Sequence, residues 1–383
     1  MQKGFRYQIP LDVPAVAPPY SKRRHSRLIS GAIILFMLLL ICALILGSRA
    51  SMQKNSARPQ PTDNQIFVED GGTVTVNPQA PSPTPFPFRE LTVPHLRARE
   101  YKSRLGQQTV SYQRPTYTAY NTSYDSDGLR INGLLTIPNG QPPEGGWPAI
   151  VFVHGYIPPA QYGSQYYDYV DYLAQHGYVV FKIDLRGHAQ SEGEAGGAYY
   201  SSDYIIDTLN ARAALQTADF INADKVGLWG HSMAGNVTLR SLAADPTIPA
   251  VAIWGGAVFT YADRLQYGIQ DGSYVPPSNQ TDRQKQRQRL RNLYGEFDAN
   301  HWFWKQVTPI NYLADATGAI SLHHSINDDV VNVEYSRGLN EILKTTKIPH
   351  NLNEYPSGGH NISGTAFVQA MQDTVAFYDK YLK

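Results

Sequence analysis

The chain has 383 residues, of which 42% are hydrophobic and 17% charged, so it is long enough to bury the core of one large domain or two small ones. Its formal net charge is +1, but residues 1–27 carry about +5, which leaves the remainder acidic by about 4. That balance excludes the basic footprint of a nucleic-acid partner, and a single cysteine excludes a disulfide within the chain.

The basic N-terminal segment is followed by an apolar run of membrane length. Residues 28–47 contain no charged side chain and would cross a hydrocarbon core as a helix. Because the positive charges lie mainly before this run, the pattern predicts a cytoplasmic tail over 1–27, a single transmembrane helix over 28–47 and an extracytoplasmic remainder. A cleaved signal peptide is the alternative. The length of the apolar run and the absence of a clean small-x-small cleavage site after it favour an uncleaved anchor.

Residues 48–88 differ in composition from the segments on either side. Seven prolines recur there among Gln, Ser and Thr. Such a composition does not bury enough apolar surface to fold alone and tends to be extended. We therefore expect a tether that holds the following domain away from the bilayer.

From residue 89 to residue 383 the pattern predicts one α/β domain. Alternating strand patterns near 109–120 lead to a hairpin at Ser126–Gly128 and a strand over 131–137. Apolar strands then alternate with helical stretches, which predicts a mainly parallel, doubly wound sheet. The expected strands are 149–153, 178–183, 226–229, 250–254, 320–323 and 352–355, and the expected helices are 166–175, 205–220, 236–244, 335–343 and 366–382.

The stretch of about 255–319 is too long for one crossover and predicts an inserted cap. Ligands bind beyond the strand ends of open α/β sheets, so the aromatic cluster Trp302–Trp304 could line a substrate pocket there. The alternative, equally compatible with the sequence, is that these rings form a small core of the cap. The polar run 282–291 is interpreted as a solvated helix face, with an anion site as the alternative.

The segment Gly230–Gly235 follows an apolar strand and opens a helix. It reads Gly-His-Ser-Met-Ala-Gly, the pattern of a nucleophile elbow, in which Ser232 occupies a strained strand-to-helix turn. Ala234 stands where the pattern prefers glycine, and alanine is the next larger residue after glycine. The alternative is an ordinary serine at a helix N-terminus. The strand, the turn and the helix together favour a nucleophile.

Acyl transfer by a serine needs a base, a carboxylate that orients the base, and donors for the oxyanion. His360 lies in a Gly-rich loop after the last strand, and Asp328 and Asp329 follow the penultimate strand, which gives the order Ser, Asp, His. Either acid could instead be a solvated loop residue. The segment 184–188 is interpreted as structural, with His188 a minor alternative as base.

The oxyanion donors are expected to be backbone N–H groups. One is the N–H of Met233, the residue after the nucleophile. The other is the N–H of Tyr156, because Gly155 would permit a sharp turn at the end of the strand over 149–153. The ring of Tyr156 would then stand at the mouth of the site.

These motifs together resemble an α/β-hydrolase over about residues 107–383. The hairpin at 126–138, followed by Pro148–Gly155, is similar to the catalytic domain of the prolyl oligopeptidase family and its dienelactone-hydrolase-like relatives. The resemblance implies a triad of Ser232, Asp328 and His360. In the family pattern the first acid of D-x-x-V orients the histidine, and Val331 stands three residues after Asp328.

The sequence thus predicts a membrane-anchored, extracytoplasmic serine hydrolase that cleaves an ester or amide through an acyl-enzyme on Ser232. Expected partners are a small ester or short peptide and the membrane, with no nucleic acid, no cofactor and no metal. One alternative is a serine exopeptidase or acylaminoacyl-type peptidase of the prolyl oligopeptidase family. Another is a non-catalytic binding module on a hydrolase fold. Substrate identity and oligomeric state are not readable from the sequence.

Overall fold

The structure is a computed structural model that describes residues 85–272 and 281–383. The chain divides into Met1–Ala80 and Pro81–Lys383, and the fold below belongs to the second unit. The predicted tail over 1–27, the predicted membrane helix over 28–47 and nearly all of the predicted tether lie outside the described residues. Within the described ranges, no helix combines the length and hydropathy that crossing a bilayer requires.

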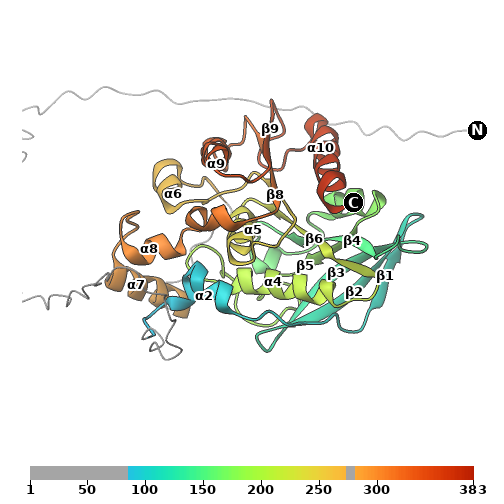
Figure 1. Cartoon of the computed structure of the whole chain (residues 1–383), viewed down its shortest axis with the longest axis horizontal. Helices are drawn as coiled ribbons and strands as arrows, with labels where there is room; N and C mark the ends of the chain where they lie inside the picture. Colours follow the sequence, from blue (N-terminus) through green and yellow to red (C-terminus); the bar gives the residue numbers. More distant parts are fainter. Residues whose placement is uncertain (1–84, 273–280) are drawn as a thin grey trace, which may run out of the picture. The chain divides into compact units, whose positions relative to one another are not determined.

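One nine-stranded sheet runs through the domain in the order β1-β2-β3-β5-β4-β6-β7-β8-β9 (Figure 1). The first three strands pair antiparallel, β3 pairs antiparallel with β5, and every pairing from β5 to β9 is parallel. The strands are β1 Thr109–Gln113, β2 Tyr117–Ser126, β3 Leu129–Pro138, β4 Trp147–Val153, β5 Val179–Ile183, β6 Ile221–His231, β7 Ala250–Trp254, β8 Ala319–Ser325 and β9 His350–Tyr355. The predicted α/β class with a mainly parallel sheet is confirmed.

Helices cover both faces of this sheet because its central strands are apolar on both faces. On β4, Ile150 and Phe152 join the core beneath α3 (Tyr167–Gln175) and α10 (Thr365–Leu382). The alternate residues Val151 and Val153 join the core beneath the helices of the opposite face. These are α4 Asp203–Gln216, α5 Ala234–Ala244 and α9 Glu334–Lys344.

The β2–β3 hairpin closes through two residues with left-handed backbone. Asp127 has φ 56° and Gly128 has φ 79°, as a two-residue type I′ turn requires. The turn lies where the sequence predicts a hairpin. Its register places ten consecutive residue pairs of β2 and β3 opposite each other.

Residues 85–99 are part of the domain and not an extended lead-in. They form η1 (Arg89–Leu91) and α2 (Val93–Ala98), whose apolar residues Leu91, Val93 and Leu96 are buried. Arg240 of α5 donates a 2.8 Å hydrogen bond to the carbonyl of Leu91. The sequence pattern becomes regular only near residue 107, so this packing was not anticipated.

Between β7 and β8, the described residues 255–272 and 281–318 form four helices, in the range where the sequence predicts an insertion. They are α6 Tyr261–Tyr267, α7 Asp282–Tyr294, α8 Trp302–Val307 and the 3₁₀ helix η3 Pro309–Asp315. The open alternative for the aromatic cluster is resolved in favour of packing. Phe303 and Trp304 are buried, and the ring of Phe303 stacks on Tyr294 at 3.8 Å between centroids.

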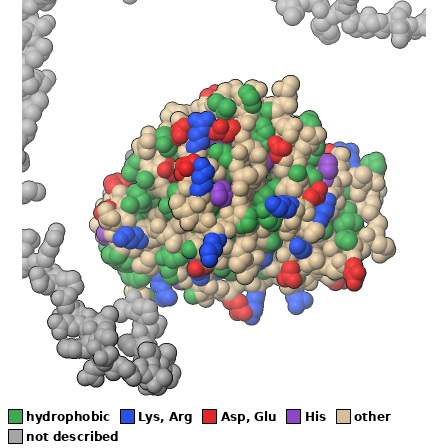
Figure 2. Space-filling model, turned by 45° about the horizontal axis from the view of Figure 1, so that its top comes forward, with side chains coloured by type: hydrophobic (Ala, Val, Ile, Leu, Met, Phe, Trp, Pro, Cys, Tyr) green, Lys and Arg blue, Asp and Glu red, His purple; other side chains and the backbone are tan. Residues whose placement is uncertain are grey.

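The polar run of α7 buries only Leu290, as expected of a solvated helix face. On the face of the molecule shown in Figure 2, basic and acidic side chains are interspersed among apolar and neutral ones. Opposite charges therefore mix over that face of the domain.

His323 of β8 is a fully buried, neutral histidine. Its Nδ1 contacts the hydroxyl of Tyr355 at 2.9 Å and its Nε2 contacts the hydroxyl of Ser321 at 2.8 Å. Burial lowers the pKa of His323 to about 3. The unfolded chain binds a proton at this position below about pH 6.5, and the folded chain does not until much lower pH.

We therefore expect the free energy of unfolding to fall as the pH drops from about 6.5 toward 3, with His323 contributing up to ~1.4 kcal/mol per pH unit. A His323→Gln variant should reduce the slope of that free energy against pH by up to ~1.4 kcal/mol per pH unit, which corresponds to one bound proton. Urea unfolding of the wild-type chain and the variant at several pH values between 4.5 and 6.5 measures both slopes. Equal slopes would contradict the assignment.

Candidate active site

Ser232 occupies a strained turn between β6 and α5. Its φ is 56°, a left-handed conformation that costs a serine about 1–3 kcal/mol and is typical of functional sites. The turn is held in place because the N–H of Ser232 donates to the carbonyl of Trp254 at 2.9 Å, and the N–H of Ala257 donates to the carbonyl of Ser232 at 3.1 Å. The predicted elbow is therefore present as a structural feature.

The small residues of the elbow are required by close backbone approach. A Cβ added to Gly230 would lie 2.7 Å from the carbonyl oxygen of Ala234, and one added to Gly235 would lie 2.7 Å from the Cα of Gly256. Ala234, the departure from the usual glycine, is fully buried and begins α5. The alanine methyl is thus accommodated at this position.

His360 and Asp328 form a direct pair beyond the ends of β8 and β9. The Nδ1–H of His360 donates to Oδ2 of Asp328 at 2.8 Å, so Nε2 remains as the nitrogen that can accept a proton. The Asp328 side chain is 1% exposed and the His360 side chain 16% exposed. Asp329, the neighbouring acid, is exposed. The structure therefore pairs the histidine with the first acid of the two.

Asp328 is held ionised by four hydrogen-bond donors. Its Oδ1 accepts the N–H groups of Val330 and Val331, both at 2.9 Å. Its Oδ2 faces Nε2 of His324 at 3.2 Å in addition to His360. Burial is the largest single influence and raises the pKa of Asp328. The hydrogen bonds from His324 and His360 outweigh it and hold that pKa well below its usual range.

His324 supports the acid and was not anticipated from the sequence. It is fully buried, its Nε2–H donates to the carbonyl of Val331 at 2.9 Å, and its Nδ1 accepts from the hydroxyl of Ser336 at 2.7 Å. This arrangement fixes the tautomer that presents Nε2–H to Asp328. The four-residue spacing of His324 and Asp328 across the end of β8 is the sequence signal that could have identified it.

A chain of hydrogen bonds connects three parts of the site. The N–H of Gly155 donates to the hydroxyl of Tyr166 at 3.1 Å, and that hydroxyl donates to Nδ1 of His231 at 2.8 Å. The Nε2–H of His231 then donates to the carbonyl of His360 at 2.8 Å. Burial, followed by the neighbouring His360, lowers the pKa of His231 to about 3. The neutral imidazole can therefore donate at one nitrogen and accept at the other.

Gly155 has a different role from the one expected. It is absent from the glycines with positive φ, so no left-handed turn requires it. A Cβ at this position would instead lie 2.7 Å from the hydroxyl of Tyr166 and 3.2 Å from Nδ1 of His231. Glycine is needed here to make room for the hydrogen-bond chain.

The two predicted oxyanion donors border the same cavity as Ser232. Tyr156 and Met233 line it together with Ser232, and the cavity has a volume of about 320 Å³. Met233 is the N-cap residue of α5, where a backbone N–H has no partner within the helix. The loop that carries Tyr156 is fixed because His188 contacts the carbonyl of Ile157 at 3.1 Å through Nε2. This contact gives the buried His188 a structural role, and so removes it as a candidate base.

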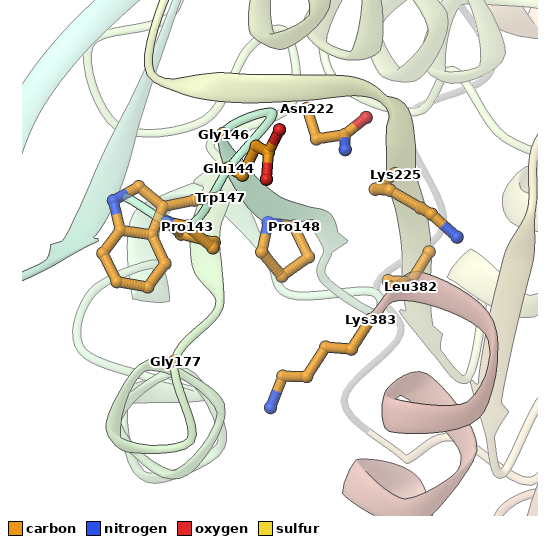
Figure 3. Close-up of a pocket in the computed structure, with 10 residues that line it drawn as sticks. All are labelled: Pro143, Glu144, Gly146, Trp147, Pro148, Gly177, Asn222, Lys225, Leu382 and Lys383. Atoms are coloured by element: carbon orange, nitrogen blue, oxygen red, sulfur yellow. The ribbon is translucent and has the colours of Figure 1, made fainter. Parts of the chain in front are cut away.

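A second cavity lies at the opposite ends of the parallel strands, where β4 and β6 begin (Figure 3). It has a volume of about 440 Å³, and Trp147, Lys225 and Lys383 contribute to its walls. None of the predicted site residues lines it. Volume alone therefore does not identify the site, whereas the strained Ser232 lines the smaller cavity.

Comparisons with known proteins agree with this fold. A family profile described as serine aminopeptidase, S33, matches residues 148–364. The chain is 24% identical over 264 residues to the uncharacterised peptidase YuxL of Bacillus subtilis (strain 168), covering 67% of this chain and 38% of that protein. The chain thus spans less than two thirds of this curated relative.

Solved structures of both esterases and peptidases share the fold. Acetyl xylan esterase 1 from Thermoanaerobacterium sp. JW/SL YS485 matches with a TM-score of 0.51 and 18% identity, covering 75% of this chain and 91% of that one. A puromycin-hydrolysing peptidase of Mycobacterium tuberculosis matches with a TM-score of 0.52 and 18% identity, covering 71% of this chain and 41% of that one. At this identity the likeness supports the fold alone.

Proposed function

The chain belongs to the hydrolase family described as serine aminopeptidase, S33, and from that membership we propose that it cleaves an ester or amide bond through an acyl-enzyme on Ser232. The observation that carries the proposal is that a left-handed Ser232 follows β6 while a buried Asp328–His360 pair follows β8 and β9. The two parts are joined by the hydrogen bond from Nε2 of His231 to the carbonyl of His360. A binding module would have no chemical need for this combination.

The proposed reaction uses each group in turn. Nε2 of His360 takes the proton of Ser232 as its oxygen attacks the substrate carbonyl, and Asp328 stabilises the imidazolium through Nδ1. The N–H groups of Met233 and Tyr156 would stabilise the oxyanion. His360 then gives the proton to the departing alcohol or amine. Water, activated by the same imidazole, hydrolyses the acyl-enzyme and regenerates Ser232.

A small ester is the favoured substrate, with a short peptide or acylated amine as the second candidate. A cavity of about 320 Å³ beneath the cap suits a small molecule. The peptide alternative rests on the family profile and on the peptidase relatives.

Membrane anchoring is a further part of the proposal and rests on the sequence alone. The uncharged run over 28–47 and the positive charges before it support a single span with the hydrolase domain outside the cytoplasmic membrane.

An activity-based fluorophosphonate probe tests the nucleophile. We expect the purified full chain to be labelled and Ser232→Ala to abolish labelling, because the probe reacts only with an activated serine. Ser357→Ala, at an exposed position in the loop that carries His360, is the matched control and should be labelled normally.

Short-chain chromogenic esters should be hydrolysed and folded proteins should not. Cleavage of folded proteins without esterase activity would overturn the substrate proposal.

The adjacent acids give a second test. Asp328→Asn should lower kcat by about 10⁴-fold, because an amide neither stabilises the imidazolium nor selects the right tautomer. Asp329→Asn should stay within about tenfold of wild type, because its exposed side chain does not contact His360. Turnover of purified variants with matched thermal stability measures both effects. If the Asp328 variant were nearly normal and the Asp329 variant inactive, the orienting acid would be Asp329, and the proposed role of Asp328 would be wrong.

The topology is tested by protease accessibility. Protease added to intact cells or spheroplasts should cut within residues 48–88 and release a soluble, active fragment. The same treatment of inverted membranes should leave that segment intact. Protection of residues 48–88 in intact cells, together with their cleavage in inverted membranes, would contradict the proposed orientation.

A further inference from the structure

Two arginines of the cap line the cavity beside Ser232. Arg264 comes from α6 and Arg287 from α7, and both line the cavity with Ser232, Met233 and Tyr156. Asp271 lies in the same wall. The formal charge of the lining is therefore positive, although the domain as a whole is slightly acidic.

Both guanidinium groups are held by aromatic rings and not by carboxylates. Arg264 lies over the rings of Tyr199 and Tyr200, at 5.1 and 5.5 Å from their centroids, and Arg287 lies over Tyr200 at 5.5 Å. Within residues 85–272 and 281–383, neither arginine forms an ion pair. Stacking on a ring face orients a guanidinium while leaving its N–H donors directed outward.

Arg283, one turn before Arg287 on the same helix, shows the contrasting arrangement. It pairs with Asp203 at 3.0 Å and with Glu194 at 3.7 Å, so its charge is satisfied within the protein. The half-buried Arg264 and Arg287 have no such partner among the described residues. Partly buried cations whose donors are unused favour a ligand that supplies the missing anion.

We infer that this cavity selects substrates that carry a carboxylate on the part lying beneath the cap. The inference rests on the proposed function and narrows its substrate class. An anionic ester would gain charge-assisted hydrogen bonds from the arginine fork. A substrate with a free ammonium group would meet two arginines against the single carboxylate of Asp271, so a peptide with a free N-terminus held beneath the cap is disfavoured.

Isosteric esters of different charge test this selection. The full chain is assayed with 4-acetoxybenzoate, which carries a carboxylate on its leaving group, and with its neutral counterpart 4-acetoxybenzamide. Mono-4-nitrophenyl adipate carries the charge on the acyl group, and its neutral isostere is the corresponding amide, 4-nitrophenyl 5-carbamoylpentanoate. In at least one pair we expect kcat/KM for the carboxylate to exceed that for the neutral ester by ~10- to 100-fold. The preference should shrink as ionic strength rises.

Arg264→Gln and Arg287→Gln should each reduce the ratio of kcat/KM for the charged ester to kcat/KM for the neutral ester about tenfold. Arg289→Gln is the matched control, because it removes one positive charge from an exposed position of α7 that does not line the cavity. Thermal unfolding of each variant establishes that the fold is retained. Equal kcat/KM for charged and neutral esters in both pairs, or an unchanged preference in both arginine variants, would overturn the inference.

A binding readout separates this inference from the proposed function. Glutarate should slow fluorophosphonate labelling of Ser232 in the wild-type chain, and should do so less in the arginine variants. Labelling with no protection by glutarate and no charge preference would refute the carboxylate selection while leaving the serine hydrolase intact. Absence of both labelling and ester turnover would refute the proposed function, and the inference with it.

Discussion

The carboxylate of Asp328 joins the ends of β8 and β9, and the geometry of the candidate site depends on it. An ionised carboxylate that is 1% exposed would be strongly destabilising without compensation. Two backbone N–H groups on one oxygen and two imidazoles on the other supply that compensation. The same contacts that make the charge tolerable also fix its direction, so His360 is held with one nitrogen occupied and the other available.

The elbow and the loop of Tyr156 are tied to this pair by the hydrogen-bond chain through Tyr166 and His231. That chain passes from backbone N–H to hydroxyl to imidazole to backbone carbonyl, so each group has one consistent donor and acceptor role. His231 must be neutral to serve in it, and burial ensures that it is. The hydrogen bonds thereby link the segments at the ends of β4, β6 and β9, although these are far apart in sequence.

The sequence allowed most of the sheet and the three candidate catalytic residues to be predicted, because both depend on local signals. Apolar runs of strand length and a Gly-rich turn around Ser232 are legible within a few residues. The D-x-x-V register places Asp328 ahead of Asp329, and the structure pairs that acid with His360.

Features that depend on contacts between distant segments were not predictable in this way. Residues 89–98 carry no strand or helix pattern that the sequence analysis recognised, and their packing is visible only in the contact between Arg240 and the carbonyl of Leu91. The aromatic cluster at 302–304 suits a pocket or a core equally well, and only its packing on Tyr294 distinguishes them. Arg287 belongs to the run 282–291 that the sequence predicts to be solvated, and only the tertiary structure places it with Arg264 in the wall of one cavity.

The position of the cap in the chain separates recognition from chemistry. Its helices are inserted between β7 and β8, two adjacent parallel strands whose pairing fixes both ends of the insertion. Gly255 at the start of the insertion already faces Asp328 and His360, and Asp328 itself follows β8. Substitutions or length changes within α6 and α7 can therefore alter what enters the cavity without displacing the reacting groups. Divergence among relatives with this architecture should accordingly concentrate in the insertion, with new specificities arising by exchange of one contiguous segment.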